Sequence, residues 1–260
     1  MQQAIDFLEE SRALHRLIAA RPVAFLDEVT QFKGWRVAEI IRHLHVWNGM
    51  ADLSRRDEDA FAEQMTRLGP GIMSGQTRVT ECEADPRTGR TLVAAWQARY
   101  ERMGAEWGGV DPKQRLKWAG PSMSARSSIS ARLMETWAHG QAIWDVAGRE
   151  RDAHARLWNI VILGVNTFGF SHQVQGLEIP EEMPGLRLTL KGEERVWGAP
   201  SAGSIVGSAE AFAQVVTQVR NCADVALQIS GPVAERWMET AQCFAGPRNP
   251  PPAAGTRYRS

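Results

Sequence analysis

The sequence has few cysteines and no excess of either charge. Its 260 residues include three cysteines, an odd count without any CxxC pair, which is typical of reduced thiols in the cytoplasm. Lysine plus arginine and aspartate plus glutamate both number 30, so the chain lacks the basic excess that phosphate binding needs. Nucleic acid is therefore not predicted as a partner.

Long apolar runs and several catalytic signatures are also missing. The best apolar run, at 157–165, is too short to span a bilayer, and the polar N-terminus lacks a signal-peptide pattern. The sequence contains no GxSxG, Walker A, GxGxxG or HExxH motif, so serine hydrolase, nucleotide-binding and zincin functions gain no support. We expect a cytoplasmic protein without a membrane partner.

The residues that are present indicate a globular chain in two parts. Hydrophobic residues make up 43% of the sequence and charged residues 23%, enough to bury a real core. Residues 1–175 have helical apolar spacing and predict an up-and-down helical bundle. Residues 176–248 mix alternating segments with helical ones and predict a small α+β domain. The tail at 249–260 is predicted to be disordered by its proline-rich composition.

Five of the helices expected in the bundle bear on the later argument. Apolar spacing and capping residues predict them at 2–19, 35–53, 57–68, 88–106 and from about 124 to 147. The helix at 57–68 is expected to end at the Gly-Pro-Gly sequence of 69–71. Gly148 is expected to stop the last one.

The most informative pair of residues is Glu135 and His139, which lie four positions apart in the last of these helices. Four residues correspond to about 400° of helical rotation, so both side chains project from nearly the same face. A carboxylate beside an imidazole offers two ligands to a borderline divalent metal, although such a pair is also common on helix surfaces. A metal site would need a third ligand from another helix.

The segment 40–47 supplies two candidates for that third ligand, His43 and His45. They are two positions apart, or about 200° around the helix, so only one can point into a given site. His43 shares a face with Ile40 and Trp47, which favours it, and His45 remains the alternative. A His, Glu, His set suits Zn²⁺, the favoured metal, and in a more open geometry Fe²⁺, Mn²⁺, Co²⁺ or Ni²⁺.

Four segments resemble a known family. They are GWRVAEIIRHLH at 34–45, WAGPSMSARSSISARLMETWAHGQ at 118–141, GPVAERW at 231–237 and AQCFAGP at 241–247. The chain resembles the DinB-like superfamily, in the branch called the mycothiol-dependent maleylpyruvate isomerase family, and within it a metal-binding subgroup. The likeness extends over nearly the whole chain.

This resemblance implies a fold, a metal site and a cosubstrate. The implied fold is a mainly α, DinB-like four-helix bundle followed by a small α+β domain similar to sterol-carrier proteins. The family's three metal ligands fall on His43, Glu135 and His139. Family members use a low-molecular-weight thiol whose thiolate binds the metal.

We therefore predict a metal-dependent enzyme whose metal activates a thiol for transfer to, or cis–trans isomerisation of, a small electrophilic substrate. Arg132 lies seven residues before His139, two helical turns, and is a candidate for holding a carboxylate in the site. The alternatives are a hydrolase or lyase that uses metal-activated water, and a non-catalytic carrier of a small ligand. The predicted assembly is a monomer or homodimer.

Overall fold

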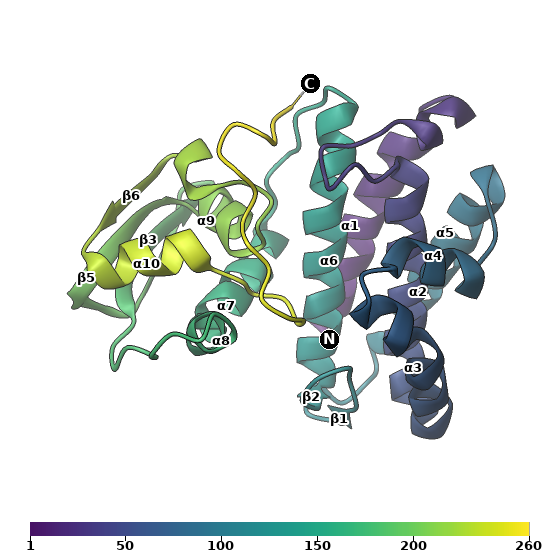
Figure 1. Ribbon diagram of the computed structural model, residues 1–260, viewed down its shortest axis with the longest axis horizontal. Helices are drawn as coiled ribbons and strands as arrows, with labels where there is room; N and C mark the ends of the chain where they lie inside the picture. The colour runs from purple at the N-terminus through teal and green to yellow at the C-terminus, as the bar shows by residue number, and fades with distance from the viewer. Residues whose placement is uncertain (260) are drawn as a thin grey trace. The chain divides into compact units, whose positions relative to one another are not determined.

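The structure is a computed structural model of the chain, and it describes residues 1–259. The described residues divide into two compact units, Met1–Ala147 and the residues from Gly148 onward (Figure 1). The first unit is helical, and the second combines helices with a small sheet. The predicted fold class, a helical bundle followed by a small α+β unit, is confirmed.

Four long helices make up most of the first unit. They are α1 (Gln2–Ala19), α2 (Val37–Arg56), α5 (Gly89–Trp107) and α6 (Ala125–Val146). The shorter elements between them are η1 (Val23–Asp27), α3 (Glu58–Met73), α4 (Thr77–Ala84), β1 (Arg115–Leu116) and β2 (Met123–Ser124).

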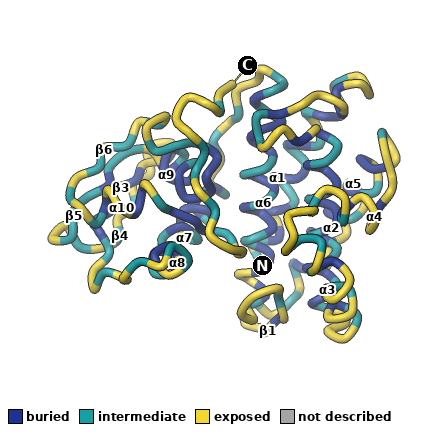
Figure 2. The backbone as a smooth tube through the Cα atoms, in the orientation of Figure 1, coloured by how far each residue is buried: buried dark blue, intermediate teal, exposed yellow. Residues whose placement is uncertain are grey.

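The order of the helices around the bundle differs from their order in the chain. Helix α1 packs against α5 and α6, and so does α2. Helices α1 and α2 therefore lie across the bundle from each other. Figure 2 shows buried residues along the bundle helices. The largest side chains of this core are fully buried and include Trp96, Tyr100 and Trp107.

The ends of α6, which carries two of the predicted ligands, follow from local sequence. Ser124 precedes the helix, and its hydroxyl accepts a hydrogen bond from the backbone N–H of Ser127 at 3.1 Å. The helix ends at Val146, and Gly148 adopts a positive φ of 62°, a conformation that costs glycine little. Both ends agree with the prediction from capping residues.

One predicted helix end was wrong. Helix α3 does not stop before the Gly-Pro-Gly sequence but runs on to Met73 with Pro70 inside it. Proline removes a single backbone donor, and the glycines on either side leave room for the chain to continue as a helix. Helix α4 follows at once, and the sequence did not predict it. This short helix later proves important for the site.

Among the described residues, the second unit contains four α-helices and a four-stranded sheet, together with two 3₁₀ turns. The helices are α7 (Trp158–Asn166), α8 (Phe168–Val174), α9 (Ala209–Val216) and α10 (Pro232–Thr240), and the turns are η2 (Ala155–Leu157) and η3 (Cys222–Asp224). The strands are β3 (Pro184–Leu190), β4 (Glu193–Trp197), β5 (Ala199–Ser208) and β6 (Leu227–Ser230).

The sheet is mixed, with the order β4-β3-β5-β6. Strands β3 and β5 are parallel, and the two outer pairs are antiparallel. Helices α9 and α10 pack against these strands and bury side chains such as Phe212 and Trp237. The ribbons of α7 and α8 lie beside α9 and α10 in Figure 1.

The boundary between the units differs from the predicted one. The prediction placed α7 and α8 in the bundle, with the division at 175, but the first unit ends at Ala147. Helix α7 packs against α9, and α8 packs against α10. Helical periodicity shows that a segment has an apolar face but not which core that face joins, so the sequence could not locate this division.

The predicted disorder of the tail is wrong for the residues that the structure describes, and Ser260 lies outside them. The backbone N–H of Asn249 donates to Gln242 at 3.0 Å, and the N–H of Gly255 donates to Asp224 at 2.9 Å. Asn221 donates to the carbonyl of Pro252 at 2.8 Å. These polar contacts fix a segment that has no apolar periodicity of its own, which composition alone does not reveal.

Within residues 1–259, none of the helices combines the length and the apolar character that crossing a membrane requires.

Candidate metal centre

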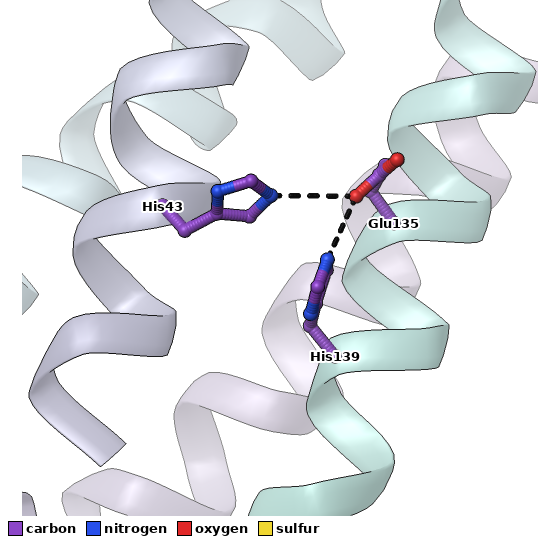
Figure 3. A group of neighbouring side chains, drawn as sticks. All are labelled: His43, Glu135 and His139. Carbon is purple, nitrogen blue, oxygen red and sulfur yellow. Dashed lines mark hydrogen bonds and ion pairs between the residues drawn. The ribbon is translucent and has the colours of Figure 1, made fainter. Parts of the chain in front are cut away.

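Three side chains from two helices converge in the first unit. His43 comes from α2, and Glu135 and His139 come from α6 (Figure 3). Nε2 of His139 lies 2.9 Å from Oε2 of Glu135, and Nε2 of His43 lies 3.5 Å from the same oxygen. The three possible ligand atoms all lie within 4.8 Å of one another. The structure thus brings together the three residues that the sequence nominated.

The donor set and its spacing fit a divalent metal. Ligand atoms on one tetrahedral zinc ion lie about 3.4 Å apart, because each bond is about 2.0–2.2 Å long. The 2.9 Å and 3.5 Å separations at Glu135 bracket that value. The three side chains are 14–18% exposed, so they are mostly enclosed but remain open to a small ligand. Three protein ligands leave at least one coordination position for such a ligand.

The charges in this cluster shift the pKa of each member. Burial raises the pKa of Glu135, but hydrogen bonds from His139 and His43 outweigh it and hold that pKa well below its usual range. Burial, followed by the charge on His43, lowers the pKa of His139. Burial also lowers the pKa of His43, yet the carboxylates of Glu81 and Glu135 reverse this and raise it to about 9. Glu135 is therefore the carboxylate at the centre of the cluster that stays deprotonated.

Aromatic rings enclose the two histidines. The ring of Phe32 lies edge-on to His139 at 4.8 Å between centroids, and Trp35 lies 5.7 Å from His43. Trp47 lies 6.3 Å from His43. These rings restrict the rotamers of the histidines and exclude water from one side of the cluster.

Arg132, the predicted carboxylate-holding residue, lies beside the cluster. Its guanidinium lies 4.0 Å from Oε1 of Glu135 and 5.0 Å from the centre of the Trp118 ring. The side chain is only 6% exposed, and burial lowers its pKa. Arg132 thus lies next to the cluster, and its role in holding a carboxylate stays a prediction.

His45, the alternative ligand, points elsewhere. Its Nε2 lies 2.9 Å from Oδ2 of Asp85, and Arg99 donates to its backbone carbonyl at 2.9 Å. His43 alone of the two takes part in the cluster with Glu135. The two-residue spacing along α2 separates the histidines as expected.

Sequence reasoning missed Glu81, a residue of α4. Its Oε1 lies 2.7 Å from Nδ1 of His43 and accepts a hydrogen bond from Nε1 of Trp47 at 2.8 Å. Neither the helix that carries Glu81 nor a spacing rule relative to His43 marked it. The sequence offered no signal either, because Glu81 shares its helical face with polar residues such as Thr77 and Arg78.

The fold and the cluster define the class as a helical bundle with a candidate two-histidine, one-glutamate metal centre. Comparison with known proteins supports the fold and gives the family. Residues 7–144 match the family described as the mycothiol maleylpyruvate isomerase N-terminal domain. Two uncharacterised proteins of Mycobacterium tuberculosis, from strains CDC 1551 / Oshkosh and ATCC 25618 / H37Rv, are each 35% identical over 244 residues. These alignments cover 93% of this chain and 95% of each relative.

The chain therefore belongs to the mycothiol maleylpyruvate isomerase family, as its sequence motifs indicated. Two solved structures share its fold. The crystal structure of the mycothiol-dependent maleylpyruvate isomerase has a TM-score of 0.56 and 13% identity, covering 88% of this chain and 91% of that one. A mutant of that enzyme has a TM-score of 0.56 and 15% identity, covering 84% and 88%.

Proposed function

We propose that this protein is a divalent-metal-dependent enzyme that uses a metal-activated low-molecular-weight thiol. The thiol is either transferred to a small electrophilic substrate or assists its cis–trans isomerisation. The observation that supports the proposal best is the convergence of His43, Glu135 and His139 from two helices far apart in sequence. Membership of a family named for a thiol-dependent isomerase supports the thiol part of the proposal.

In this proposal the three side chains hold one ion and leave a position open toward solvent. A divalent ion there would lower the pKa of a bound thiol or water, so that a nucleophile exists at neutral pH. His43 and His139 contribute imidazole nitrogens, and Glu135 contributes a carboxylate whose low pKa keeps it deprotonated. Phe32 and Trp35 shield the histidines from competing water.

Arg132 is proposed to orient the reactants. Its guanidinium is nearly buried, and its nearest carboxylate oxygen, on Glu135, lies at 4.0 Å, longer than a hydrogen bond. An incoming carboxylate of the thiol or the substrate would gain a charge-assisted, two-point contact with such a group. Because Arg132 touches no predicted ligand at hydrogen-bonding distance, its loss should affect reactant binding more than metal binding.

The proposed isomerisation is a balanced addition and elimination. The thiolate sulfur forms a bond to one carbon of a cis double bond conjugated to a carbonyl, and the π electrons move onto the carbonyl oxygen. Rotation follows about the carbon–carbon bond, which is now single. The electrons then return, the carbon–sulfur bond breaks, and the thiolate is regenerated together with the trans product. Thiol transfer stops after the addition, with a proton taken up at carbon.

The test uses cobalt-substituted full-length protein. Addition of mycothiol, glutathione, coenzyme A or bacillithiol in separate experiments should produce sulfur-to-metal charge-transfer absorption in the near ultraviolet for the accepted thiol. The same thiol should support turnover of a cis-configured, conjugated keto acid. Arg132→Lys should keep the cobalt spectrum of the resting protein but raise the thiol or substrate concentration needed for half-saturation.

Two results would overturn the proposal in different directions. If no thiol perturbs the cobalt spectrum while water exchange at the metal is visible, the open position serves water, and a hydrolase or lyase reaction replaces the thiol chemistry. If the full-length protein binds no divalent metal at all, the catalytic proposal fails and the small-ligand carrier becomes the better interpretation.

A further inference from the structure

A carboxylate outside the three predicted ligands is buried directly behind one of them. The side chain of Glu81 is only 2% exposed. No lysine or arginine among the described residues lies within ion-pair distance of it, although a buried carboxylate is costly unless its oxygens receive hydrogen bonds. One oxygen, Oε1, receives two: from Nδ1 of His43 at 2.7 Å and from Nε1 of Trp47 at 2.8 Å.

This arrangement divides the two nitrogens of His43 between two tasks. Nδ1 faces Glu81, whose carboxylate oxygen can only accept, so Nδ1 carries a hydrogen. Nε2 points to the cluster, 3.5 Å from Glu135 (Figure 3). When the hydrogen on Nε2 is lost, the neutral imidazole keeps its hydrogen on Nδ1 and presents the lone pair of Nε2, which is the form that binds a metal.

The second histidine of the cluster has no comparable support. Nε2 of His139 faces Glu135 at 2.9 Å, as in His43, but Nδ1 of His139 has no hydrogen-bond partner among the described residues. Its ring is held by aromatic contacts, edge-on to Phe32 and stacked on Trp35. The cluster is therefore asymmetric, with an electrostatically supported ligand on α2 and a sterically supported one on α6.

The segment that delivers Glu81 is itself anchored to α2. The buried guanidinium of Arg42 donates to the carbonyl of Asp85 at 2.9 Å and to the carbonyl of Arg87 at 2.8 Å, immediately after α4. At the other end of α4, Arg78 pairs with Glu39 of α2 at 3.5 Å. Glu81 thus reaches His43 from a helix that is attached to the ligand's own helix at both ends.

We infer that Glu81 is a positioning residue for the metal centre: its carboxylate orients His43, fixes the hydrogen on Nδ1 and strengthens Nε2 as a ligand. The inference rests on the metal site of the proposed function. Trp47 takes part by directing its N–H to the same oxygen, which restricts the carboxylate to one rotamer. Outer partners of this kind contribute about 10- to 100-fold to metal affinity in proteins.

The experiment compares the Zn²⁺ dissociation constants of the wild type and four variants by competition with a chromogenic chelator. Glu81→Ala removes the acceptor and should weaken binding by about 100-fold, whereas Glu81→Gln keeps an acceptor oxygen without the charge and should weaken it by about 10-fold. Trp47→Phe should cost less than Glu81→Gln. Glu83→Gln, an exposed acidic position of the same helix, is the matched control and should change affinity less than about twofold.

A second readout separates positioning from stability. Long-range ¹H–¹⁵N spectra of the zinc-loaded wild type should show a hydrogen on Nδ1 of His43 that exchanges slowly with solvent. The signal should persist in Glu81→Gln and disappear in Glu81→Ala, while thermal unfolding confirms that each variant is folded.

The outcomes distinguish this inference from the function on which it rests. If the wild type binds zinc through the three predicted ligands, but Glu81→Ala and Glu81→Gln bind it equally well and keep the Nδ1 signal, the positioning role is refuted and the metal site stands. If the wild type binds no zinc, the metal site itself is refuted.

Discussion

Helix α2 carries two histidines, the half-buried His43 and the buried His45. Each lies beside a carboxylate from the segment that follows α3, yet their surroundings give them opposite properties. His43 pairs with Glu81 and His45 pairs with Asp85. Burial lowers the pKa of His43, but Glu81 and Glu135 together raise it to about 9. Burial, followed by the charges of Arg99 and Arg87, lowers the pKa of His45 to about 4 even though Asp85 opposes this shift.

The comparison shows that one carboxylate partner does not decide how a buried histidine behaves. For His43 the carboxylates of Glu81 and Glu135 together outweigh the effect of burial on the pKa, whereas for His45 burial and nearby arginine charges together outweigh Asp85. The face with two carboxylates collects positive charge and suits a metal ion. The face with the arginine keeps its imidazole neutral and serves packing between helices.

The largest difference between the His43 face and the His45 face of α2 should appear in metal binding. His43→Ala, Glu135→Ala and His139→Ala should each weaken Zn²⁺ binding by more than about 100-fold, because two remaining ligands provide too little binding free energy. His45→Ala should bind about one ion per chain, like the wild type, even though it loses a buried polar group. Metal content after dialysis, measured by atomic emission, checks this. Metal loss in His45→Ala with retention in His43→Ala would reverse the assignment of the two faces.

The second prediction concerns Arg42, whose removal should weaken both histidine–carboxylate pairs. Arg42→Ala removes the two hydrogen bonds to the carbonyls of Asp85 and Arg87, and with them the attachment of the segment that carries both carboxylates. The free energy of unfolding should fall by about 2–3 kcal/mol in urea titrations, because the carbonyls lose a charged donor. Arg78→Ala, which breaks an exposed ion pair between α4 and α2, should cost less than about 1 kcal/mol. Equal losses in the two variants would contradict the anchoring role of Arg42.

The third prediction concerns the pH dependence of the metal-free protein. The folded-state pKa of His43 is raised from 6.5 to about 9, so the folded state binds the extra proton in this window and its stabilisation is lost as pH rises from 6.5 to 9. The pKa of His45 is lowered from 6.5 to about 4, so the unfolded state binds the extra proton there and stability falls as pH drops from 6.5 to 4. From these two groups, stability should be greatest near pH 6.5.

Chemical denaturation at a series of pH values tests this shape. His43→Gln should flatten the alkaline side of the curve and leave the acid side, whereas His45→Gln should do the reverse. A curve whose two sides respond to the same substitution would show that the histidines titrate as one unit.

The smallest expected effect comes from removing the second unit. Both histidine–carboxylate pairs lie within Met1–Ala147, which has its own core of buried residues. A chain ending after Ala147 should retain helical circular dichroism, cooperative unfolding and the distinct nuclear magnetic resonance titrations of His43 and His45. Loss of cooperative unfolding would show that the first unit depends on the remainder of the chain.

The sequence by itself determined much of this protein. Helical spacing fixes which residues share a face, and so the four-residue step from Glu135 to His139 and the two-residue step from His43 to His45 already separated the cluster from its alternative. The caps of α6 followed from Ser124 and Gly148 for equally local reasons. The family motifs, which lie in these same segments, pointed to the fold.

Other features depended on which segments meet in space, and local periodicity does not contain that information. The tertiary structure placed α1 and α2 across the bundle from each other and assigned α7 and α8 to the second core. It also continued α3 past Pro70 and folded α4 back so that Glu81 meets His43, 38 residues earlier in the chain. A carboxylate and an imidazole so far apart in sequence become partners only when the packing of two helices removes both from water, and no spacing rule predicts that.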